Sequence, residues 1–246
     1  MKSAYRMTRV LLVLAFPVAT HAAEPQGDLI ELHSCQLYTG GCTASSEATL
    51  GGRSLVRFWN IESGTHLGTN LGGIQVAVIQ TADANLAFQD TLPTTTSVYF
   101  APETSESTVE AVVAWLAQSD PTLSRSGIEI RRERLVFKRI RDSVLLRVGS
   151  VAHLEATALA NCETGACGQQ LWYTPRSRVA AFKVIAYRKA SVNAESLKLS
   201  WSDHGKPSVF LARFGESVNL ARVKLAGTEV CAPDFTPKLG SSEKEI

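Results

Sequence analysis

The residues of this chain that are best suited to chemistry are Cys35 and Cys42, together with the histidine that precedes them. His33 lies two positions before Cys35, and Gly40 and Gly41 stand next to Cys42. Two thiolates and an imidazole form a ligand set that suits a soft metal such as Cu(I) or zinc. The same cysteines can instead form a disulfide, since the glycines permit the tight reversal that closes a short loop.

A second pair, Cys162 and Cys167, surrounds Gly165. This spacing fits a disulfide-closed turn and differs from the two-residue spacing of a zinc knuckle or a thioredoxin-type pair. Because the chain has five cysteines, at least one is left over, and pairing within each loop leaves Cys231. An exposed lone thiol can act as a nucleophile, which gives the alternative hypothesis of a thiol-dependent enzyme.

Residues 1–22 have the three parts of a secretory signal peptide. Lys2, Arg6 and Arg9 precede an apolar run over 10–18, and small residues then lead to cleavage after Ala22 or Ala23. The apolar run is shorter than the ~20 residues that span a bilayer, and no later stretch approaches that length. We therefore expect an exported protein, periplasmic or extracellular, without a transmembrane segment in its mature chain.

The expected compartment bears on the cysteines, because paired thiols outside the cytoplasm are usually oxidised. We therefore predict disulfides within each loop, Cys35–Cys42 and Cys162–Cys167. Metal binding by His33, Cys35 and Cys42 remains the alternative for the first loop.

Short segments rich in β-branched and aromatic residues predict strands, separated by turn-forming residues. The segment 105–121 differs, because its apolar residues recur at helical spacing, Ser107 and Glu110 form a capping box, and Asp120-Pro121 ends the helix. This pattern predicts an α+β protein in which a mostly antiparallel β-sheet carries one amphipathic helix on its face. The predicted strands cover 54–61, 74–80, 97–101, 144–148, 180–188, 196–201 and 208–214.

Composition and patterning together indicate one domain over residues 23–215. The hydrophobic content of 45% and the formal charge of +2 are ordinary for a globular protein and argue against a disordered chain. Residues 216–246 become polar and irregular, so we expect a C-terminal extension whose end is disordered.

Basic residues concentrate in 130–147, where seven Lys or Arg face only two acidic residues. Such a run can bind an anionic partner, for example a lipid headgroup or a polysaccharide. Nucleic acid is not expected as a partner of an exported protein. The alternative is a solvated face of a long hairpin. The candidate anion-binding residues are Arg131, Arg134, Lys138 and Arg139.

No complete catalytic motif occurs in the sequence. It has no Gly-x-Ser-x-Gly elbow, no His-Glu-x-x-His and no phosphate-binding loop. Asp203 and His204 are adjacent, so on a strand they point to opposite faces, and a catalytic triad would need further partners that the sequence does not identify. The sequence therefore gives no support to a particular enzymatic reaction.

Three stretches occur in order along the chain: GDLIELHSC near the start, FWNIESGTHLGTNLGGIQVAVI, and DHG at 203–205. In their order and spacing they resemble the bacterial family known as domain of unknown function 1326, and the similarity covers about 27–215. Typical members carry two Cys-x-Cys pairs in the opening loop, which implies a soft metal such as Cu(I) or zinc. This chain departs from that layout, because Leu37 stands where the second cysteine is expected.

We conclude from the sequence that the chain is an exported, non-enzymatic binding or accessory protein of the cell envelope. The resemblance implies metal handling, with copper as the expected metal, as its specific role. The alternatives are a thiol-dependent enzyme and a structural envelope protein that docks anionic partners through the basic segment.

Overall fold

The computed structural model describes residues 23–35, 37–39, 52–86, 94–124, 127–158, 170–171 and 174–215. Of these residues, 59% lie in strands, which confirms the expectation of a β-rich protein. No helix in the described ranges is long and apolar enough to cross a membrane. The predicted signal peptide and C-terminal extension lie outside the described residues, as do Cys42, Cys162, Cys167 and Cys231.

One large sheet of eleven strands forms most of the molecule. In spatial order its strands are β8 (Ile128–Arg132), β7 (Thr94–Phe100), β6 (Gln75–Ala82), β3 (Ser54–Ser63), β1 (Gln26–His33), β15 (Lys206–Phe214), β13 (Ala181–Ala194), β11 (Ala152–Ala158), β10 (Ser143–Val148) and β9 (Leu135–Ile140), and β14 (Leu199–Asp203) also pairs with β13. Two small sheets pair β2 (Tyr38–Thr39) with β12 (Gln170–Leu171), and β4 (Thr65–His66) with β5 (Thr69–Asn70).

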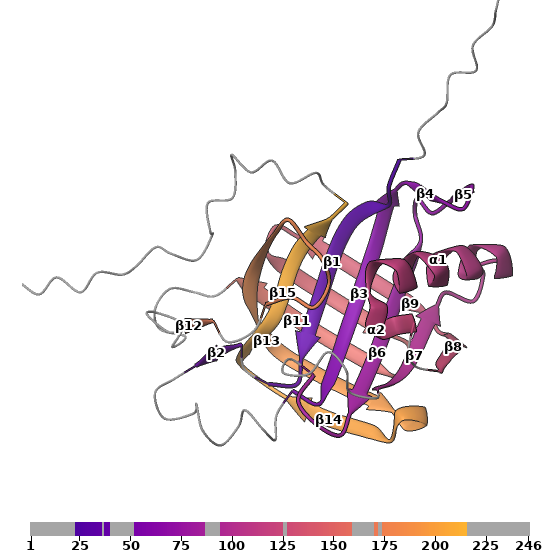
Figure 1. Cartoon of the computed structure of the whole chain (residues 1–246). Helices are drawn as coiled ribbons and strands as arrows, with labels where there is room; N and C mark the ends of the chain where they lie inside the picture. The colour runs from indigo at the N-terminus through magenta and orange to yellow at the C-terminus, as the bar shows by residue number, and fades with distance from the viewer. Residues whose placement is uncertain are drawn as a thin grey trace, which may run out of the picture.

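The large sheet curls on itself like a half-barrel. Figure 1 shows β1, β3 and β6 in front and the strands of residues 135–158 crossing behind them. The inner face is a hydrophobic core to which both halves contribute, for example Ile30 in front and Leu154 behind. Phe58 of β3 stacks on Phe137 of β9 with their ring centroids 5.2 Å apart. This packing fixes the two halves of the sheet relative to each other.

The predicted fold class is wrong in its sheet, which is mixed instead of mostly antiparallel, because β7 pairs with β8 in parallel. Its α+β part fits this mostly β protein with a helix packed on the sheet. Parallel neighbours need a crossover connection. Here the helices α1 (Glu106–Ser119) and α2 (Pro121–Ser124) supply it between β7 and β8. Short η2 (Glu195–Leu197) lies between β13 and β14.

Helix α1 packs on the outer face of the sheet. Its buried residues Val112 and Trp115 share a core with Trp59 of β3 and Phe100 of β7. The predicted end of the helix is confirmed, since the C-cap is Asp120.

The start of α1 differs from the predicted capping box at Ser107 and Glu110. The N-cap is Ser105, whose hydroxyl accepts a hydrogen bond from the Thr108 backbone N–H at 3.2 Å. A serine occurs at both positions, so the sequence pattern alone did not distinguish the two starts.

The predicted long basic hairpin is divided between the two edges of the sheet. Glu133 and Arg134 connect β8, at one edge, to β9, at the other edge. Only β9 and β10 pair as a hairpin, with Ser143 opposite Ile140. The basic residues of 130–147 are therefore divided between β8 at one edge of the sheet and the β9–β10 hairpin at the other edge.

Candidate functional site

Strands β1 and β3 place charged side chains on the outer face of the sheet. Glu31 and His33 follow Leu29 at a spacing of two, so the three side chains point to the same face, and Leu29 belongs to the core under α1. Arg57 of β3 lies opposite Glu31 in the strand register. Glu31 and Arg57 are both 0% exposed, and such buried charges need partners.

Glu31 holds residues 174–178 against the sheet. Its Oε1 lies 2.8 Å from Nε2 of His33 and accepts the Arg176 backbone N–H at 2.7 Å, while Oε2 accepts the Ser177 N–H at 3.2 Å. Burial by itself raises the pKa of Glu31, but the hydrogen bond from His33 and the charges of His33 and Arg57 hold it below its usual value. Glu31 is therefore a carboxylate that connects β1 to a distant part of the chain.

Arg57 connects the sheet to the end of α1. Its guanidinium donates to the Asp120 carboxylate and to the Gln80 side chain of β6, and Gln80 donates to Thr96 at 3.2 Å. Burial by itself raises the pKa of Asp120, but the Arg57 charge and the hydrogen bonds from Thr122 and Arg57 lower it below the usual value. The arrangement joins three strands to the helix through buried polar contacts.

The predicted metal ligands are only partly described. His33 is 2% exposed and is hydrogen bonded to Glu31, and its ring meets Phe210 edge-on at 5.5 Å. Cys35 is partly buried and packs against Leu37 and Phe210, whereas Cys42 lies outside the described residues. In the described ranges no three His, Cys, Asp or Glu side chains gather closely enough to hold a metal. A copper or zinc site at His33, Cys35 and Cys42 stays a prediction.

The predicted disulfides also stay predictions, because each includes a cysteine outside the described ranges. Strand β2, which lies between Cys35 and Cys42 in the sequence, pairs with β12, which follows Cys167. Thr39 of β2 lies opposite Gln170 of β12, and Tyr38 opposite Leu171.

The four candidate anion-binding residues have different surroundings. Arg131 of β8 pairs with Glu129 at 2.6 Å, and Arg139 of β9 reaches across the inner face of the sheet to Asp28 of β1. Arg134 and Lys138 are exposed. Anion binding by these residues stays a prediction, but two of the four cations already contact a carboxylate.

Arg139 should contribute more to stability than Lys138, its neighbour in the sequence. We expect Arg139→Gln to lower the free energy of unfolding by about 1 to 2 kcal/mol, because the Asp28 side chain is only 8% exposed and keeps just Arg213, at 3.3 Å, as a cation. Lys138→Gln, at an exposed position of the same strand, is the control and should change stability little. Urea unfolding of both variants measures the difference, and equal effects would contradict the structural role of Arg139.

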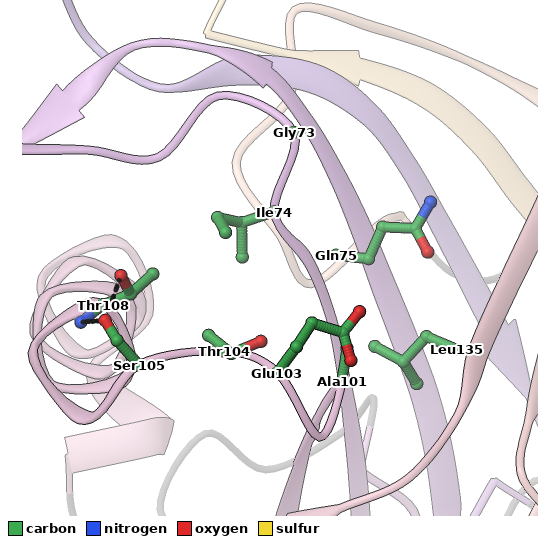
Figure 2. Close-up of a pocket in the computed structure, with 9 residues that line it drawn as sticks. All are labelled: Gly73, Ile74, Gln75, Ala101, Glu103, Thr104, Ser105, Thr108 and Leu135. Carbon is green, nitrogen blue, oxygen red and sulfur yellow. Dashed lines mark hydrogen bonds between the residues drawn. The ribbon is translucent and has the colours of Figure 1, made fainter.

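A pocket of ≈ 420 Å³ opens at the start of α1. Such a volume falls within the roughly 300–1,000 Å³ of small-ligand sites. Figure 2 shows that it lies between the turn before β6, the connection from β7 to α1, and the first residue of β9. The side chains that define it include Ile74, Gln75, Glu103, Thr104, Thr108 and Leu135.

The pocket was not predicted from the sequence. Its residues come from three distant stretches and are of common types, with no spacing that marks a ligand site. They meet because the curl of the sheet brings Leu135 of β9 beside Gln75 of β6, which no local pattern reveals.

No family model matches the chain, and no curated protein or solved structure matches it either. The resemblance to the family of domain of unknown function 1326 therefore stays an expectation, and the interpretation of the site rests on its geometry.

Proposed function

We propose that this protein is an exported, non-enzymatic binding protein of the cell envelope, and that its ligand site is the pocket at the start of α1. The observation that carries the proposal is the pocket itself, in which polar and aliphatic side chains converge on one space. Export is inferred from the signal-peptide pattern of residues 1–22.

The elements around the pocket favour binding without large rearrangement. Gln75 begins a strand that is paired on both sides, with β3 and β7. The connection from β7 to α1 is held by Arg132, which donates to the backbone carbonyls of Ala101 at 3.4 Å and Thr104 at 2.7 Å. A site built on paired strands and a fixed connection is preorganised, which lowers the entropic cost of binding.

Filling the pocket should abolish binding. We expect amide chemical-shift changes at 73–75 and 101–108 when n-pentylamine, 1-pentanol or pentanoate is titrated into the labelled protein, with at least one of these probes causing them. Ala101→Phe places a ring in the pocket and should remove the changes, because the ring occupies the ligand volume. The control is Ala181→Phe, which places the same ring at an exposed position of β13.

The result depends on both variants keeping the fold, which thermal unfolding of each checks. Shift changes that survive in Ala101→Phe, or changes confined to other parts of the sheet for all three probes, would refute the pocket as the ligand site.

A further inference from the structure

We infer that the ligand of this pocket carries a protonated amino group on a short aliphatic chain. This inference rests on the proposed function and adds the chemical class of the ligand. It follows from three properties of the lining: the hydrogen-bonding atoms that it presents, its charge, and its aliphatic walls.

The first property is an excess of hydrogen-bond acceptors. The Nε2 of Gln75 donates a hydrogen bond to Asn60 Oδ1 at 3.2 Å. This bond fixes which side of the Gln75 amide carries the nitrogen, so the oxygen Oε1 occupies the opposite side. In Figure 2 the Glu103 carboxylate points toward Gln75 and Leu135. A carboxylate and an amide oxygen are both acceptors, so they call for a ligand that donates hydrogen bonds.

The second property is the charge of the lining. Glu103 is the one ionisable residue that lines the pocket, and among the described residues it makes no ion pair. Arg132, which holds the connection from β7 to α1, does not line the pocket, and it is paired with Glu106 in the first turn of α1. That acidic residue also offsets the positive end of the helix. The net charge in the pocket is therefore negative, and it favours a cation over an anion.

The third property is the pair of aliphatic side chains. Ile74 and Leu135 stand on two sides of the space that Figure 2 shows between the strands. Both are partly buried, so they offer apolar surface that a hydrocarbon chain can cover, at roughly 25 cal/mol for each Å² removed from water. An ammonium group beside Glu103 and a short chain along Ile74 and Leu135 satisfy all three properties at once.

The test compares three probes that share a five-carbon chain and differ in the head group: n-pentylamine, 1-pentanol and pentanoate. We expect pentylamine to bind about two- to fivefold more tightly than the alcohol, because Glu103 is exposed and an ion pair at an exposed carboxylate is worth at most about 1 kcal/mol, and pentanoate to bind least. Glu103→Gln should remove most of the preference for the amine while the alcohol still binds. Glu110→Gln, an exposed glutamate on α1 outside the pocket, is the matched control.

The outcomes separate this inference from the proposed function. If pentanol or pentanoate binds in the pocket as tightly as the amine, the ligand class is wrong and the binding site stands. If Glu103→Gln leaves the preference for the amine unchanged, Glu103 does not select the ligand and the inference fails. If none of the probes changes the amide chemical shifts of the pocket residues, both the proposed binding site and the inferred ligand class are wrong.

Discussion

Arg57→Met is expected to lower the free energy of unfolding by about 3 to 5 kcal/mol, because it leaves the buried Asp120 carboxylate without its cation. Methionine has a similar length, so the change removes the charge and the donors while it fills most of the same volume. The side chain of Arg57 is 0% exposed and that of Asp120 is 10% exposed. Neither group can therefore recover much hydration when its partner is lost.

A double-mutant cycle tests whether the loss comes from the ion pair. Arg57→Met combined with Asp120→Asn should recover more than about 1 kcal/mol relative to the sum of the single changes, since the unpaired charge is then gone. Asparagine also keeps an oxygen for the Thr122 N–H, which donates to Asp120 at 2.8 Å. Urea unfolding of the four proteins supplies the numbers. Additive effects would show that Arg57 stabilises the fold by packing alone.

The matched control for Arg57 is an exposed arginine in a strand. Arg131 pairs with Glu129, and both side chains are nearly half exposed. Arg131→Met should leave stability almost unchanged, because exposed ion pairs contribute little. A large decrease in the free energy of unfolding of Arg131→Met would mean that removing any arginine from the sheet destabilises the fold, whether or not it is buried.

Glu31→Gln is expected to lower the free energy of unfolding by about 2 to 3 kcal/mol, because an amide presents one acceptor where Glu31 now serves three donors. Those donors are Nε2 of His33 and the backbone N–H groups of Arg176 and Ser177. Residues 174–178 should also exchange their amide hydrogens faster, since Glu31 is what joins them to β1. Hydrogen exchange and urea unfolding measure the two effects.

The difference in the free energy of unfolding between the wild type and Glu31→Gln should depend on pH, and the pKa of Glu31 gives the sign of that dependence. The pKa of Glu31 in the folded protein lies below the ordinary value of a glutamate, about 4.5, so its contribution to stability is complete above the unfolded pKa and is lost as the pH falls through the folded pKa. The difference in stability between the wild type and Glu31→Gln should narrow as the pH falls below about 4.5. Glu129→Gln is the exposed control. A difference that widens as the pH falls below about 4.5 would contradict a lowered pKa for Glu31.

Local patterns predicted much of the secondary structure. The alternating segments 54–61 and 208–214 lie within β3 and β15, and the helical segment that ends at Asp120 is α1. The direction of strand pairing could not be predicted from such patterns, because the residues of one strand do not show which other strand it pairs with. Strand β8 was therefore assigned to a basic hairpin, although the crossover through α1 makes it a parallel partner of β7.

The buried polar contacts were predictable only in part. His33 was singled out as a metal ligand, and the period of two on a strand also places Glu31 on its face, but Glu31 was not considered. The pairing of Arg57 with Asp120 spans 63 positions and depends on how α1 crosses the sheet. The sequence likewise placed Arg139 among candidate anion-binding residues on a basic segment. In the structure the curl of the sheet brings Arg139 beside Asp28.

The place of β1 in the sheet affects how the chain can fold. β1 lies between β3 and β15, so Gly27 pairs with Ile61 on one side and with Phe214 on the other. Strand β1 can therefore pair with both β3 and β15, and so connect the two halves of the sheet, only when nearly all of the described chain is available. Contacts of such large sequence separation slow folding, and until they form, unpaired strand edges can associate with other chains. A cell that makes this protein needs to keep its early strands from aggregating until the last strands arrive.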